Sequence, residues 1–185
     1  MSKKTGFIPL FGGYRHLHSY QKAEIIFDGT VNFTQRFLNP YDRTIDQMVQ
    51  AARSGKQNIA EASMASATSK ETEIKLTNVA RASLEELLID YEDFLRIRNL
   101  PRWPKNDRLV KRLQELNKST PHPNYETFKK AIEHESSEIA ANTLITLICM
   151  CSYLLRQQLH QLEQAFLQEG GLRERMLQAR IKSRK

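Results

Sequence analysis

The chain has 185 residues with 40% hydrophobic and 26% charged side chains, a composition that suits one folded domain with its own core and excludes wholesale disorder. Its net charge of +7 favours an anionic partner. The first residues lack the apolar stretch of a secretion signal, and the longest uncharged apolar window, residues 139–155, is too short and too polar to span a membrane. We therefore expect a cytoplasmic protein without a membrane contact.

Two periodic blocks open the chain and predict two helices. The first covers about residues 17–38 and ends at Asn39-Pro40, because the residue before proline is pushed out of the helical region. The second covers about 42–64, with Asp42 or Thr44 as a candidate cap at its start. Its inward line consists largely of small residues, with Ala52, Gly55 and Ala62 among them. This line predicts that a neighbouring helix approaches closely.

The rest of the chain predicts two more long helices and a connection between them. The third helix covers about 69–97, with Ser69 as its N-cap. A short basic amphipathic helix near 107–117 follows within the proline-bounded connection 99–125. The last helix covers about 125–168, with a break predicted near 133–137, and Gly170-Gly171 ends it. Cys149 and Cys151 lie two apart on this helix and point to different faces, so we expect both to be reduced.

These elements predict an all-α fold, an antiparallel up-down-up-down four-helix bundle with a short extra helix in the connection between the third and fourth long helices. We expect one domain over residues 1–185. It comprises an irregular N-terminal arm at 1–16, the basic connection at 99–125 and a basic C-terminal tail at 170–185.

A set of polar residues on the second and third predicted helices needs partners if it faces the bundle interior. The set comprises Arg53, Asn58, Glu61, Arg81, Ser83 and Glu85. A buried network of this kind must be satisfied almost completely to be tolerated. We expect it to serve contacts between helices or between subunits, and ligand binding is the alternative.

Positive charge gathers in two segments, which makes them the candidate nucleic-acid-binding residues. Residues 96–118 contain eight Lys or Arg against two acids, and residues 167–185 contain six against two. The candidates are Arg96, Arg98, Arg102, Trp103, Lys105, Arg108, Lys111, Arg112, Arg173, Arg175, Arg180 and Lys182. The ring of Trp103 either stacks on a base or packs under its loop. The tail either completes the bundle, grips a neighbouring subunit or extends as an arm that binds a polyanion.

Two motifs on consecutive predicted helices resemble a known family. Asn58, Ile59, Ala60 and Glu61 match an NIAE-type motif, and residues 80–87, ARASLEEL, match an A-x-x-S-L-x-E-L-type motif. The pair resembles the four-helix-bundle family that includes proteins encoded in 23S rRNA intervening sequences and the accessory protein of diversity-generating retroelements. The two ends of the chain are similar to its subgroup called the four helix bundle suffix domain.

This chain departs from the family pattern at Ala62, where many relatives have glycine, and at Gly55-Lys56, where they place proline. The second helix is therefore expected to bend less there. The resemblance implies an up-down-up-down bundle, a ring-shaped homo-oligomer of five subunits and a positively charged surface suited to nucleic acid. It implies no enzymatic activity.

The sequence contains no recognisable catalytic or metal-binding constellation. It has no Glu-x-x-His pair, and His134-Glu135 lacks the second histidine of a zinc helix. Gly12-Gly13 is not followed by the Lys-Ser/Thr pair of a phosphate loop. We therefore expect a non-enzymatic protein without cofactor or metal, which self-associates and binds RNA or DNA with little sequence preference. The alternative is a protein-interaction or assembly module that binds a partner protein and has no nucleic-acid role.

Overall fold

The computed structural model describes residues 13–169, 176–177 and 180–181, and within these residues it is all-helical. A short 3-10 turn, η1, covers Tyr14–His16. The helices are α1 (His18–Phe37), α2 (Thr44–Ala65), α3 (Lys70–Ile97), α4 (Arg108–Ser119), α5 (Tyr125–Ile132) and α6 (Ser137–Glu169). The predicted all-α class is confirmed. Of the predicted irregular arm, residues 1–12 lie outside the described residues, and residues 14–16 form η1.

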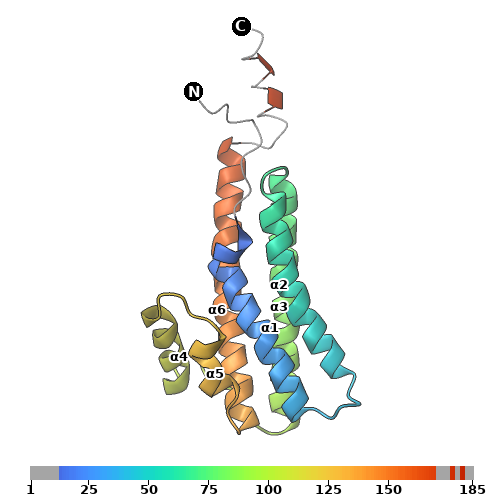
Figure 1. Cartoon of the computed structure of the whole chain (residues 1–185), viewed down its shortest axis with the longest axis vertical. Coiled ribbons are helices and arrows are strands. Elements are labelled where there is room, and N and C mark those ends of the chain that lie inside the picture. The colour runs from blue at the N-terminus through green and yellow to red at the C-terminus, as the bar shows by residue number, and fades with distance from the viewer. Residues whose placement is uncertain (1–12, 170–175, 178–179, 182–185) are drawn as a thin grey trace.

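The four long helices α1, α2, α3 and α6 form an antiparallel bundle (Figure 1). Each packs against two neighbours, in the order α1, α2, α3, α6 and back to α1. The connections 38–43 and 66–69 are short, so consecutive helices must run in opposite directions. Helices α4 and α5 stand beside the lower half of α6 in the view of Figure 1.

Local sequence explains where the helices begin and end. Ser69 Oγ accepts a hydrogen bond of 3.1 Å from the backbone N–H of Thr72, as the predicted N-cap of α3 requires. Asn99, with a φ of 54°, ends α3 in the left-handed conformation that asparagine tolerates better than most residues. The N–H of Leu100 then bonds back to the carbonyl of Leu95 at 2.9 Å, which satisfies one terminal carbonyl.

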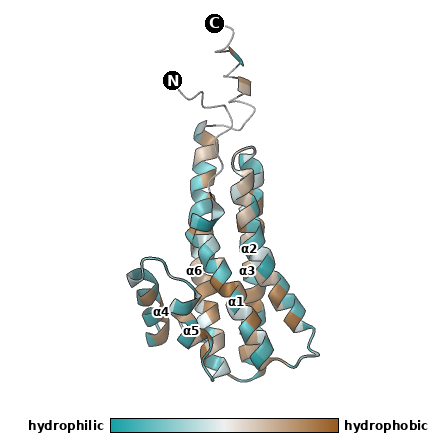
Figure 2. Ribbon diagram, viewed as in Figure 1, coloured by the Kyte–Doolittle hydropathy of each residue, from teal (hydrophilic) through white to brown (hydrophobic). Residues whose placement is uncertain are grey.

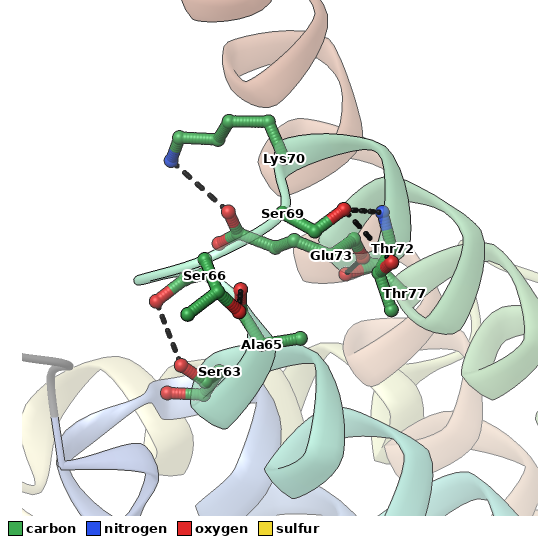
Figure 3. A network of polar contacts seen from close by, with 9 residues as sticks. Ser63, Ala65, Ser66, Ser69, Lys70, Thr72, Glu73 and Thr77 are labelled. Atoms are coloured by element: carbon green, nitrogen blue, oxygen red, sulfur yellow. Dashed lines mark hydrogen bonds and ion pairs between the residues drawn. The ribbon is translucent and has the colours of Figure 1, made fainter. Parts of the chain in front are cut away.

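The turn between α2 and α3 is fixed by further polar contacts, shown in Figure 3. Ser66 Oγ donates to the carbonyl of Ser63 at 2.7 Å and so ends α2. On the other side of the turn, the buried Glu73 carboxylate accepts from Lys70 Nζ at 3.0 Å. Glu73 and Glu71 also place negative charge in the first turn of α3, where the helix dipole favours it.

The core lies where the four long helices meet and extends under α4 and α5. Phe33 of α1 packs edge to face against Tyr91 and Phe94 of α3, with ring centroids 5.0 and 4.8 Å apart. Leu113 of α4 and Phe128 of α5 join the same cluster. Figure 2 shows hydrophobic and hydrophilic positions mixed along every long helix, as expected for amphipathic helices whose outer faces meet water.

The small-residue seam on α2 brings α3 close, as the sequence predicts. Gly55 is buried, and a Cβ added to it would lie 2.9 Å from Leu84 Cδ2. Beside it, the hydroxyls of Ser54 and Ser83 lie 3.0 Å apart across the two helices. The seam therefore depends on glycine, because a larger side chain would push Leu84 out of its packed position.

The predicted last helix, about residues 125–168, is divided into two helices, and the predicted position of the break near 133–137 is confirmed. Helix α5 ends at Ile132, and α6 begins at Ser137. His134 Nδ1 accepts from the backbone N–H of Ser136 at 3.0 Å in between. By length and apolar composition α6 is also long enough to cross a membrane, although 67% of its most apolar window is buried inside the bundle. The core helix of a soluble protein passes the same test, so the absence of a membrane span stays a prediction.

Candidate functional site

The arginines at the end of α3 and in the following loop are held by neighbouring side chains. Arg96 pairs with Asp93 at 2.7 Å, and both side chains are exposed. The Arg98 guanidinium lies 3.9 Å from the ring centroid of Phe94. Arg102 Nη1 pairs with Glu92 Oε1 at 2.5 Å, which partly neutralises it. The two ion pairs partly neutralise Arg96 and Arg102, whereas the ring contact leaves the charge of Arg98 uncompensated.

Trp103 packs under its loop rather than standing free for a base. Its ring is half-buried against the core. The indole N–H donates to Glu138 Oε1 at 3.2 Å, and the backbone N–H donates to Asn142 Oδ1 at 2.8 Å. Asn142 also donates to the carbonyl of Pro101, so the loop is bound to α6 at both Pro101 and Trp103. Of the two uses foreseen for this ring, the structure places it in the packed one.

The cations of α4 lie outside the core. Val110 and Leu113 are its buried residues, and Arg108, Lys111 and Arg112 are exposed. Asp107 begins the helix by accepting from the N–H of Leu109 at 2.7 Å. In the predicted basic tail, Arg180 is exposed, and Arg173, Arg175 and Lys182 lie outside the described residues.

A groove of about 660 Å³ lies between α4 and α6, with α3 and the basic loop at its edge. Five cations line it against one carboxylate, Glu85. They are Lys22, Arg102, Lys105, Lys118 and Arg156. Because Arg102 already pairs with Glu92, the excess is smaller than the count suggests, yet it stays positive. A concave wall with an excess of positive charge concentrates anions, since its low-dielectric sides focus the field.

Lys22 is the unusual member of this set, because it is a charged residue of α1 with only 4% of its surface exposed. Its Nζ donates to Asn117 Oδ1 of α4 and lies 4.6 Å from the ring centroid of Phe128. Burial lowers the pKa of this ammonium to about 8. Lys22 is therefore still mostly protonated at neutral pH, with fewer compensating contacts than a buried charge usually has.

Three further groove residues lie on α6. Ser152 is 5% exposed, and its hydroxyl has no hydrogen-bond partner among the described residues. Tyr153 is 55% exposed and is the more accessible aromatic ring of the groove. Cys149 is exposed, whereas Cys151 on the other side of α6 is fully buried and donates to the carbonyl of Ser19 at 3.3 Å.

The groove combines predicted residues with residues that sequence reasoning missed. Arg102, Trp103 and Lys105 were among the candidates, and they line it. Lys22, Lys118, Arg156 and Tyr153 were not. Lys22 lies on an apolar helix face and is not part of a cluster of charged residues in the sequence. Arg156 and Tyr153 are separated from the basic loop by some fifty residues, and only the folding of α6 against α4 brings them there.

The predicted polar set on α2 and α3 is only partly brought together. Ser54, which was not in the set, is its centre: it faces Ser83 at 3.0 Å and accepts from Asn58 Nδ2 at 3.1 Å. Arg81 instead bonds to Asn78 on its own helix at 3.1 Å. Arg53, Glu61 and Glu85 are exposed, which corrects the expectation of a buried network around them. A role at a subunit interface stays a prediction for these three.

Among the described residues, no group of three or more His, Cys, Asp or Glu side chains lies close enough to hold a metal ion. The chain matches no protein-family model, no curated protein and no solved structure at a significant level. The family resemblance of the NIAE-type and A-x-x-S-L-x-E-L-type motifs therefore stays a prediction, and the case for a function depends on the geometry of the groove.

Proposed function

We propose that this protein is a non-enzymatic, self-associating helical bundle that binds single-stranded RNA or DNA in the groove between α4 and α6. The observation that carries the proposal is the gathering of five cations around one groove, four of them exposed and Lys22 almost fully buried, with a single carboxylate among the lining residues. Phosphates of a flexible strand are suited to such a groove, because cations on its two sides can contact successive phosphates.

The remaining features of the groove support the same ligand. Tyr153 offers an exposed ring on which a base can stack, and the partnerless hydroxyl of Ser152 and the amide of Asn117 lie along the same wall. None of these groups is arranged to read the edges of one particular base. The binding we expect is therefore dominated by phosphate contacts and tolerant of sequence.

Salt dependence is the direct test of this proposal. Three or four exposed cations that contact a single strand predict a slope of log K against log salt of about −2 to −2.8, hence roughly a 20- to 50-fold loss of affinity between about 50 and 200 mM salt. The measurement is fluorescence anisotropy of a labelled oligonucleotide. A flat titration, or no binding at low salt, contradicts the proposal.

The location is tested by charge removal. We expect Lys118→Gln with Arg156→Gln to weaken binding about 10-fold at low salt and to make the salt slope shallower by about 1.4 units. The matched control removes two exposed cations that do not line the groove, Arg43→Gln with Lys75→Gln. If both pairs weaken binding equally, the effect is one of overall charge and the groove is not the site.

The native cysteines give an independent footprint. Cys149 lines the groove and is exposed, and Cys151 is buried. A bound strand should therefore slow the alkylation of Cys149, while Cys151 stays unreactive until the protein unfolds. Unchanged alkylation of Cys149 under saturating oligonucleotide would place the strand elsewhere on the surface.

Self-association is supported by apolar side chains on the outside of α3. Val79, Ile89 and Ile97 are 45%, 53% and 66% exposed. The alternative function, a protein-interaction module, uses the same observation with a different protein as the partner. Light scattering with mass resolution, combined with the absorbance ratio of the fresh protein, separates the two. A homo-oligomer that carries nucleic acid supports the proposal, and a stoichiometric second protein without nucleic acid supports the alternative.

A further inference from the structure

A second pocket lies on the other side of α4, between α4, α5 and the start of α6. Its volume is about 370 Å³, within the range of small-molecule sites. Leu109, Leu113 and Leu116 of α4 form one wall. Phe128 of α5 and Ile139 of α6 form the opposite one. At about 30 Å³ per water, this is room for a molecule of roughly a dozen non-hydrogen atoms.

The charged side chains around this pocket have one sign. Arg112 of α4 and Lys130 of α5 are exposed residues of its lining. No carboxylate occurs among the described residues that line it. Neither Arg112 nor Lys130 forms an ion pair within the described part of the chain, whereas Lys129, the neighbour of Lys130, pairs with Glu126 at 3.1 Å. The mouth of the pocket is therefore complementary to an anion.

The wall also contains an unsatisfied polar group. Thr143 is fully buried on α6, and its Oγ1 has no hydrogen-bond partner among the described residues. Leaving a buried hydroxyl unpaired costs about 1–3 kcal/mol, so native proteins rarely do so without a reason. An apolar body in the pocket offers no partner to this hydroxyl, so Thr143 gives no preference for an anion.

We infer that this pocket binds a small organic anion, with an aliphatic or aromatic body between α4 and α5 and a carboxylate at Arg112 and Lys130. The body is held by removal of apolar surface from water, and the head group by charge-assisted hydrogen bonds at the rim. This site is separate from the nucleic-acid groove and does not depend on it, although Trp103 contributes to the walls of both.

Trp103 provides the readout, because it is the only tryptophan of the chain. The probe is octanoate, with 1-octanol as its uncharged analogue. We expect a saturable change of Trp103 fluorescence with one octanoate per chain by calorimetry, and at least about 10-fold weaker binding of octanol. No saturable signal for octanoate up to about 10 mM, or equal binding of octanol, overturns the inference.

Substitutions locate the ligand. Arg112→Gln with Lys130→Gln should remove the preference for octanoate over octanol, and Lys111→Gln, an exposed cation of the same helix that is not part of this lining, should not. Ala131→Phe should abolish binding of both compounds by filling the space. Leu116→Tyr repeats that test at a position already 37% exposed, in case the first variant misfolds. Full binding by a folded filling variant, or loss of the preference in Lys111→Gln alone, contradicts the site.

A final control separates this pocket from the groove. Lys118→Gln with Arg156→Gln leaves the apolar pocket intact and should not change octanoate affinity. If that pair abolishes the octanoate signal, the anion binds in the groove and the inference is wrong. If that pair weakens nucleic-acid binding and leaves octanoate affinity unchanged, the result supports the inference.

Discussion

Lys22 Nζ of α1 donates a hydrogen bond to Asn117 Oδ1 near the end of α4, and this contact ties the bundle to the connection between its third and fourth long helices. The ammonium is almost fully buried at the same place where the groove begins. A buried charge with one amide partner and one aromatic ring is incompletely compensated. Its protonation should therefore be visible in the stability of the protein.

Burial lowers the pKa of Lys22 from 10.5 to about 8, which predicts that its contribution to stability improves as the pH rises. Between these two values the unfolded chain binds more protons than the folded one, so the free energy of unfolding rises with pH through this window. The gain is at most about 3 kcal/mol. We expect the unfolding free energy of the wild type minus that of Lys22→Met to rise from pH 7 to pH 9.5.

The comparison with Lys22→Met is needed because other buried groups act in the opposite direction. Burial raises the pKa of Cys151 from 9.0 to about 12, so its contribution to stability falls as the pH rises above about 9. Because Lys22 lowers the pKa of Cys151, the comparison is made with Cys151→Ala in both proteins, which removes the thiol titration from the difference. Lys75→Met, at a side chain that is 71% exposed, is the control for the loss of a lysine charge outside the core. A flat difference for Lys22→Met would contradict the buried-ammonium account.

The hydrogen bond between Tyr91 and Thr30 predicts that removing its donor and removing its acceptor cost unequal amounts of stability. The phenol of Tyr91 donates to Thr30 Oγ1 at 3.1 Å, and Thr30 donates onward to the carbonyl of Ile26 at 2.8 Å, with both residues fully buried. Tyr91→Phe leaves the Thr30 donor paired and should cost about 1 kcal/mol. Thr30→Val strands the phenol donor and should cost more, about 1–3 kcal/mol. Urea unfolding of the two variants measures the order, and the reverse order would show that the phenol finds another acceptor.

Sequence reasoning succeeded where the cause is local. Ser69 caps α3 because its side chain reaches an N–H three residues on, and the break before Ser137 is marked by its own polar sequence. The close approach at Gly55 was also readable, because small residues recur on one helix face. Each of these features is determined by residues close to it in the sequence.

Sequence reasoning fell short where distant segments meet. It left open whether Trp103 stacks on a base or packs under its loop, and only Glu138 and Asn142, some forty residues later, show why the ring is held in the fold. It could not place Lys22 in the groove, because the positions of Asn117 and Phe128 around it are set by how α4 and α5 dock. Pairing across such separations depends on packing rather than on periodicity.

A neighbouring side chain approaches Gly29 even more closely than Leu84 approaches Gly55. A Cβ at Gly29 would lie 2.6 Å from Leu144 Cδ2 and 3.3 Å from Ile132 Cγ2, and Leu144 is fully buried. Overpacking of this kind costs about 1–3 kcal/mol, against a gain of about 1 kcal/mol in helix propensity for alanine. We therefore expect Gly29→Ala to destabilise the protein in thermal or urea unfolding.

A double-mutant cycle tests the cause of that loss. In the background Leu144→Ala the clashing methyl is gone, so Gly29→Ala should become neutral or stabilising. The coupling of the two changes should be at least about 1 kcal/mol. Additive effects would mean that the backbone around Gly29, rather than Leu144, resists the substitution.

The aromatic rings of the groove make opposite predictions for nucleic-acid binding. Tyr153 is 55% exposed on the groove wall, whereas Trp103 is held by its bond to Glu138. If a base stacks on Tyr153, Tyr153→Ala should weaken oligonucleotide binding by about 1–3 kcal/mol, or roughly 5- to 150-fold. Trp103→Phe should lower the unfolding free energy by about 1 kcal/mol and leave affinity within about twofold.

Tyr41 provides the matched control, because it is 94% exposed in the connection between α1 and α2 and does not line the groove. Tyr41→Ala should leave anisotropy titrations at a fixed salt concentration unchanged. If Trp103→Phe costs more affinity than Tyr153→Ala in folded protein, the loop must open on binding and release its ring to the strand. If Tyr41→Ala costs as much as Tyr153→Ala, stacking is not localised in the groove, since any exposed ring then serves a flexible strand equally well.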